Sequence, residues 1–126
     1  MFINEIRKAI SSIANHCHQG FTFDFERGAL ATSGYVVATE DTQDCFGSAG
    51  LLNVISYCIM HPGFCIGGWR NEDGVMQYDA SQVVMSIEEA ISLAIENGQR
   101  AIFNLYTVRE IRAYDYQRYS RRRLVA

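Results

Sequence analysis

The sequence of 126 residues has one proline, four cysteines and no long apolar run. Its longest apolar segment, residues 51–60, is interrupted by Asn53 and Ser56 and is shorter than the roughly 18 residues that a membrane span needs. Charged residues also interrupt the N-terminal segment, so we expect no secretory signal. The scarcity of cysteine predicts reduced thiols in a cytoplasmic protein, because a disulfide-dependent fold of this size would need more of them.

Positive charge is scarce in most of the chain. Residues 1–113 contain seven basic and thirteen acidic side chains, whereas residues 114–126 contain four arginines and one aspartate. An acidic body repels a phosphate backbone, which argues against general binding to duplex nucleic acid. Any anionic ligand is therefore expected to be small and to be held by a few local arginines.

Three helices are indicated by periodicity and by end signals. Apolar side chains at steps of three and four predict an amphipathic helix over residues 2–15. Residues 51–60 are apolar on most faces, which predicts a buried helix that ends before Pro62. A capping box from Ser86 to Glu89 starts the clearest helix, which stops at Gly98.

Strands are indicated by alternating apolar residues between turn signals. The pattern predicts a hairpin over residues 21–39 that turns at 26–28, a strand over 64–71, a return strand over 75–78, and strands over 100–105 and 109–114, with 82–85 a candidate for one more. These elements predict a single α+β domain over residues 1–126, with a basic, tyrosine-rich tail from residue 113. We expect a mostly antiparallel sheet of six or seven strands packed by two or three helices. We also expect an oligomer, because the apolar stripe of the first helix is suited to an interface between protomers.

Metal binding has weak support in the sequence. His16, Cys17 and His18 are adjacent, and His61 precedes Cys65 by four residues. Structural zinc sites show paired C-x-x-C or H-x-x-x-H spacings, and neither occurs in this chain. We therefore predict no metal site and no cofactor.

Catalysis is likewise weakly indicated. Cys58, His61 and Cys65 are the candidates for a Cys/His nucleophilic pair, but Cys58 lies in an apolar helix, where a thiol is normally inert. The Gly67-Gly68 pair favours close backbone packing over phosphate contact. We predict a protein that is not an enzyme, with a small Cys/His enzyme as an open alternative.

Ligand capture by arginines and aromatic rings is the third possibility. Guanidinium groups match phosphate oxygens, and aromatic faces stack on nucleobases. We expect Arg27, Arg109 and Arg112 to hold the anion, with Asn97 and Asn104 forming hydrogen bonds to the rest of the ligand, which the resemblance described below implies to be ribose or adenine. Arg109 and Arg112 are three positions apart on one strand, so they are expected to point to opposite faces. Residues 121–123 are better explained as a solvated basic tail.

Two stretches of the sequence resemble a known family. They are GFTFDFERGALATSGYVVATED and GGWRNEDGVMQYDASQVVMSIEEAISLAIENGQRAIFNLYTVREIR, with a G-Y-x-V-A strand, a G-G-W strand and an E-E-A-I-x-x-A-x-E-N-x-Q-x-A-I-F pattern. The family pattern also has a Y-x-D turn, whereas Tyr78 and Asp79 are adjacent in this chain. Together they are similar to the first type of phage Thoeris anti-defence protein. The resemblance covers about residues 20–113.

The resemblance implies a specific function. Such proteins are sponges that bind a cyclic ADP-ribose-type immune signal, made by a TIR-domain protein, without cleaving it. They assemble as dimers that join into hexamers, and some also bind cyclic oligonucleotides at separate sites. The implied location is the cytoplasm of the infected bacterial host. A different alternative is an interaction module of a phage or mobile element that inhibits a host protein directly.

Overall fold

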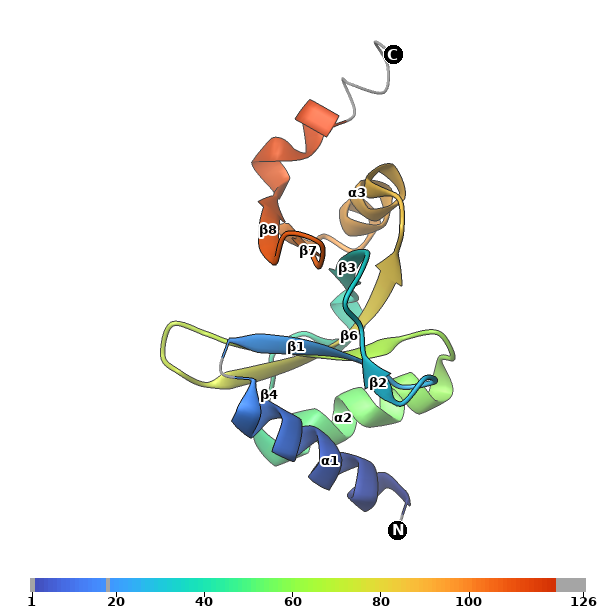
Figure 1. Cartoon of the computed structure of the whole chain (residues 1–126), viewed down its shortest axis with the longest axis vertical. Helices are drawn as coiled ribbons and strands as arrows, with labels where there is room; N and C mark the ends of the chain where they lie inside the picture. The colour runs from blue at the N-terminus through green and yellow to red at the C-terminus, as the bar shows by residue number, and fades with distance from the viewer. Residues whose placement is uncertain (1, 18, 120–126) are drawn as a thin grey trace.

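A computed structural model describes residues 2–17 and 19–119 and has an α+β fold with a curled antiparallel sheet (Figure 1). Its helices are α1 (Phe2–His16), α2 (Gly47–Met60) and α3 (Ile87–Glu96), with short 3-10 turns at Glu40–Thr42 and Ala113–Asp115, and residues 116–119 are also helical. Its strands are β1 (Gly20–Asp24), β2 (Ala29–Leu30), β3 (Tyr35–Ala38), β4 (Cys45–Phe46), β5 (Cys65–Arg70), β6 (Met76–Val84), β7 (Ala101–Asn104) and β8 (Arg109–Arg112). No helix in these residues is long and apolar enough to cross a membrane.

The long strand β6 joins two halves of the molecule. The sheet order is β2-β1-β5-β6-β3-β7-β8, and β4 pairs with β6 beside β3. Helices α1 and α2 pack with the start of β6 in a first core that includes Ile10, Leu51 and Ile66. Helix α3 packs with β3, β7 and β8 in a second core that includes Ile102, and the end of β6 lies against it (Figure 1).

Both cores lie on one face of β6, because its even-numbered residues point toward them. Met76, Tyr78 and Ala80 belong to the first core, and Val84 packs against the second. Successive side chains of a strand alternate between faces, so the odd-numbered residues of β6 lie on the other face. We call this other side of the sheet the second face.

The predicted α+β class and the three helices are confirmed, and the sheet has eight strands rather than six or seven. Ser86 caps α3 as expected, since its hydroxyl accepts a hydrogen bond from the Glu89 amide at 3.3 Å. Gly98 takes the positive φ of 62° that a glycine stop requires. Helix α2 begins at Gly47 rather than Leu51, because β4 ends at Phe46 and the chain turns directly into the helix.

The predicted hairpin over residues 21–39 is wrong in its second half. The turn closes at Gly28, but the return strand of this hairpin is only the two-residue strand β2, and the other edge of β1 pairs with β5. Gly34 then redirects the chain with a φ of 103°, and β3 pairs with β6 and β7 instead. The pairings that place β3 are with residues 43 to 69 positions later in the sequence, where no local pattern can report them.

The return strand predicted over 75–78 and the candidate strand over 82–85 are one strand, β6. Aspartate is disfavoured in strands, so Asp79 weakens the local strand pattern between the two predicted segments. In the structure, the Ser81 hydroxyl donates to the Asp79 carboxylate on the same face, which satisfies part of its hydrogen-bonding capacity.

Two segments expected at the surface contribute to packing within the chain. The apolar stripe of α1 buries Ile10 fully and Ile6 and Ile13 partly, leaving Phe2 and Ile3 exposed. An interface on α1 therefore stays a prediction and has less apolar surface than the sequence suggested. At the other end, Tyr116 of the predicted tail is buried in the second core and donates to the Gln99 carbonyl at 3.2 Å. His18 and residues 120–126, with the basic run 121–123, lie outside the described residues.

Candidate functional site

The Cys58–His61–Cys65 region has the properties of packed side chains. The Cys58 thiol donates to the Cys65 carbonyl at 3.6 Å, and burial raises the pKa of Cys58 to about 12 and that of Cys65 to about 11. A nucleophilic cysteine needs a lowered pKa, because the thiolate is the reactive form. His61 stacks on Tyr57 with ring centroids 4.0 Å apart. These thiols therefore lack the activation that nucleophilic catalysis requires.

The structure brings together no metal-ligating cluster within residues 2–17 and 19–119. All four cysteines are free, and three of them are buried. His16 bonds the carbonyl of Ser12 at 2.8 Å, one helical turn earlier, and Cys17 follows the end of α1.

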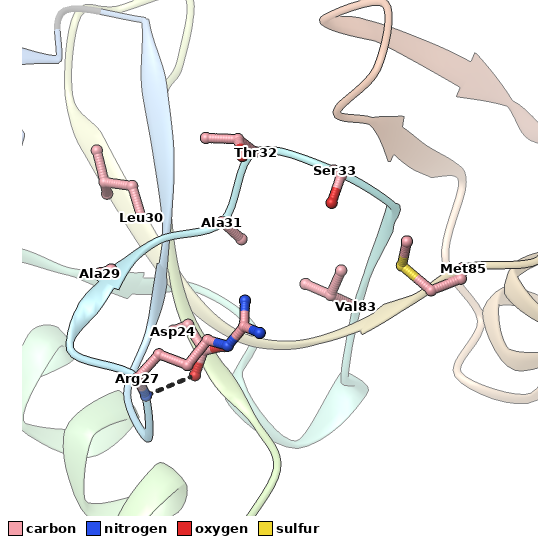
Figure 2. A pocket seen from close by; sticks show the side chains of 9 residues that line it. All are labelled: Asp24, Arg27, Ala29, Leu30, Ala31, Thr32, Ser33, Val83 and Met85. Atoms are coloured by element: carbon pink, nitrogen blue, oxygen red, sulfur yellow. Dashed lines mark hydrogen bonds and ion pairs between the residues drawn. The ribbon is translucent and has the colours of Figure 1, made fainter.

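A pocket of about 300 Å³ lies on the second face between the β1–β2 turn and the end of β6 (Figure 2). It is lined by Asp24, Arg27, residues 29–33, Val83 and Met85. The connection from β2 to β3 forms one wall, with the hydroxyl-bearing residues Thr32 and Ser33. Its volume is at the lower end of the range for small-molecule sites, about 300–1,000 Å³.

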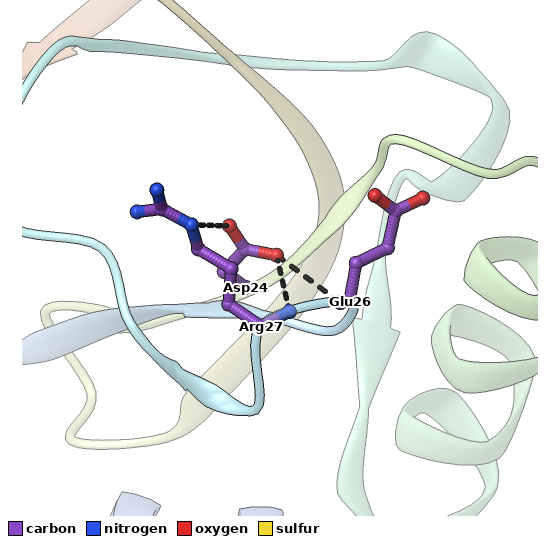
Figure 3. Close-up of polar contacts among 3 residues, drawn as sticks. All are labelled: Asp24, Glu26 and Arg27. Atoms are coloured by element: carbon purple, nitrogen blue, oxygen red, sulfur yellow. Dashed lines mark hydrogen bonds and ion pairs between the residues drawn. The ribbon is translucent and has the colours of Figure 1, made fainter.

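The Arg27 side chain is positioned at this pocket by the turn that carries it. Asp24 accepts hydrogen bonds from the amides of Glu26 and Arg27 at 3.1 and 3.2 Å, which closes the turn before Gly28 (Figure 3). The Arg27 Nε lies 4.0 Å from the Asp24 carboxylate, and the side chain is 83 % exposed. Its guanidinium points into the space opposite Val83 and Met85 (Figure 2). Both Nη groups have no hydrogen-bond partner among the described residues, so they are available to an anion.

The two predicted asparagines have structural roles. The Asn97 amide donates to the Leu93 carbonyl at 2.9 Å at the end of α3, and its oxygen accepts from the Thr39 hydroxyl. The Asn104 oxygen accepts from the amides of Tyr106 and Thr107, which forms the β7–β8 turn. A ligand would have to compete with these bonds.

Arg109 and Arg112 are exposed on β8, at the far edge of the sheet from the β1–β2 turn. The register pairs Arg109 with Asn104 and Arg112 with Ala101, which places the two arginines on opposite faces as expected. Arg112 forms an ion pair with Glu110 at 2.9 Å. Of the predicted residues, the structure thus places Arg27 alone in the pocket, while the other four lie in the second half of the molecule.

Sequence reasoning missed the other walls of the pocket and a buried acid. Val83 and Met85 line the same pocket as Arg27 although more than 50 residues separate them in the sequence, a proximity that local patterns do not encode. Asp79 lies on the second face, and burial raises the pKa of its carboxyl against the opposing effect of the Ser81 hydroxyl. The signal in the sequence that could have found Asp79 is its position within a run of alternating apolar residues.

The Gly67-Gly68 pair has the packing function that the sequence predicted. A methyl group on Gly67 would collide with the Asp79 carboxylate, and one on Gly68 would collide with the ring of Phe21. The two glycines therefore admit a polar side chain on one face of β5 and an aromatic ring on the other.

No protein-family model, curated protein or solved structure matches this chain.

Proposed function

We propose that the protein captures a small phosphate-bearing nucleotide signal of the cyclic ADP-ribose type without cleaving it, as a phage anti-defence sponge. The ligand class comes from the resemblance of residues 20–113 to the first type of phage Thoeris anti-defence protein. The observation that carries the proposal is the unpaired face of the Arg27 guanidinium in a pocket with hydroxyl and apolar walls.

The chemistry of the pocket suits capture of an anion. Two unpaired Nη groups match two oxygens of one phosphate, and Thr32 and Ser33, which line the same pocket, add hydroxyl groups as neutral donors. Leu30 and Met85 supply apolar surface for a ribose or a base. The positive charge of the Arg27 guanidinium is needed at the pocket, because the net negative charge of residues 1–113 would otherwise repel an anionic ligand.

The deciding experiment separates capture from cleavage. Protein is mixed with cyclic ADP-ribose, filtered, heat-denatured, and the released small molecules are identified by mass spectrometry. We expect the free ligand to be depleted and intact ligand to be recovered after heating. Recovery of altered ligand would instead support a Cys/His enzyme, and no depletion would favour direct inhibition of a host protein.

Variants of the arginines then locate the site. Loss of a hydrogen bond to a charged group costs about 1.5–3 kcal/mol, so Arg27→Ala should weaken binding roughly 10- to 100-fold by titration calorimetry. Lys8→Ala, an exposed cation on α1, is the matched control and should bind as the parent does. Parallel titrations of Arg109→Ala and Arg112→Ala test the second half of the molecule. Wild-type affinity for Arg27→Ala would place the ligand elsewhere.

A further inference from the structure

A row of side chains crosses the second face away from the Arg27 pocket. The registers place Gly20 opposite Trp69, Trp69 opposite Gln77, and Gln77 opposite Phe46, on β1, β5, β6 and β4. Directly opposite residues of antiparallel strands project from the same face. Trp69 is 45 % exposed and Phe46 is 41 % exposed, so both rings present surface to solvent.

The two rings are separated by a distance that suits one small group between them. Two strand spacings put their Cα atoms about 10 Å apart, with the shorter polar side chain of Gln77 between them. A cation is attracted to an aromatic face when it lies within about 6 Å of the ring centroid. A group midway between Trp69 and Phe46 can therefore contact both rings.

The charges beside the row are negative. Asp79 lies two residues after Gln77 on β6 and therefore projects from the same face. Its carboxylate lies over Gly67, which is two residues before Trp69 on β5. Asp44 immediately precedes β4. The nearest cation in the sequence, Arg70, points to the opposite face, where its guanidinium donates to the carbonyls of Gly74 and Ala14.

The Asp79 carboxylate also keeps an unused acceptor. The Ser81 hydroxyl donates to Oδ1, and Oδ2 accepts no hydrogen bond from the described residues. Among these residues, no side-chain oxygen or nitrogen is both sealed from solvent and without a partner. The Asp79 side chain is half-buried, and burial raises the pKa of its carboxyl.

We propose that Trp69, Phe46 and Asp79 form a binding site for a methylated ammonium cation, separate from the Arg27 pocket. Two exposed aromatic side chains provide rings for cation–π attraction, and the carboxylate provides the counter-charge, which is the combination that quaternary ammonium groups select. The acidic surroundings disfavour a phosphate-bearing ligand at this position. The site does not depend on the proposed nucleotide capture.

Trp69 is the sole tryptophan of the chain, so its fluorescence reports on this site without interference from other indoles. Choline is titrated into the protein at pH 8, and 3,3-dimethylbutanol, which has the same shape without the charge, is titrated in parallel. We expect saturable quenching by choline and at least tenfold weaker binding of the neutral analogue. Equal binding of the two compounds would overturn the proposal, as would absence of quenching by choline at millimolar concentration.

Two variants test Asp79 and Phe46 individually and a third serves as the control, with folding checked by circular dichroism. Asp79→Asn and Phe46→Ala should each weaken choline binding about tenfold, while Asp73→Asn, an exposed acid of the β5–β6 turn, should leave it unchanged. Choline should also bind the parent more tightly as pH rises and Asp79 ionises, and this pH dependence should be lost in Asp79→Asn. Adenosine binding more tightly than choline would assign the rings to base stacking and overturn the inference.

Discussion

The half of the molecule that contains α1 and α2 differs from the half that contains α3 in the side chains on the second face of the sheet. In the first half, that face has small and polar residues, including Thr22, Gly67, Asp79 and Ser81. In the second half, Val36 and Phe103 are paired there, next to the Glu110–Arg112 ion pair. The Trp69 row lies in the first half, whereas the Arg27 pocket reaches from the β1–β2 turn to Val83 and Met85 at the end of β6. The glycines and short polar side chains of the first half thus leave room on this face that the larger side chains of the second half fill.

The largest expected effect tests whether the two halves are one folding unit. Ile66 of the first core and Ile102 of the second are both fully buried. Replacement of either by alanine should lower the free energy of unfolding by about 2–5 kcal/mol. Because β6 contributes to both cores, each variant should unfold in one transition, with Trp69 fluorescence and far-UV circular dichroism coinciding. Two separated transitions in urea would show that the halves are independent.

A smaller loss of unfolding free energy is expected when a methyl group is added to the tightly packed first core. Gly68→Ala forces a methyl group against the Phe21 ring and should cost about 1–3 kcal/mol in urea unfolding. The double variant Phe21→Leu with Gly68→Ala should recover part of that loss, because the smaller side chain makes room. Simple additivity of the two single effects would contradict the contact.

The corresponding change in the second half removes a helix cap. Ser86→Ala deletes the acceptor for the Glu89 amide and should lower stability by about 1 kcal/mol. Ser92, exposed in the middle of α3, provides the control, and its replacement by alanine should be neutral or slightly stabilising. If both serine variants lost equal stability, the cap would have no specific contribution.

The smallest expected effect is an increase in stability, and it concerns the Asp79 carboxyl. A carboxyl whose pKa is raised by folding binds more protons in the folded state, so its contribution to stability falls as pH rises above the unfolded value of 3.8. Asp79→Asn should therefore be more stable than the parent at pH 7, and the difference should vanish at pH values below 3.8. Thermal unfolding across this range, with Asp73→Asn as the exposed control, measures it. A variant that is less stable at pH 7 would mean that the carboxylate makes compensating contacts.

The positions of the helices and tight turns follow from the sequence itself. The apolar stripe of α1, the Ser86 cap, and the stops at Pro62 and Gly98 act over a few residues, so periodicity and end signals are sufficient to predict them. Arg27 could likewise be placed at a hairpin turn, because Gly28 supplies the positive φ that the turn needs.

The tertiary structure alone decided which strands pair and which side chains meet. Strand β3 pairs with β6 and β7, and β6 continues through Asp79, because of contacts between residues distant in sequence. The same long-range pairing brings Val83 opposite Arg27, and places Phe46 and Trp69 in one row. Short-range patterns specify the face that a residue occupies within its own strand. The neighbours on that face depend on the order of strands in the sheet, which is set by burial over the whole chain.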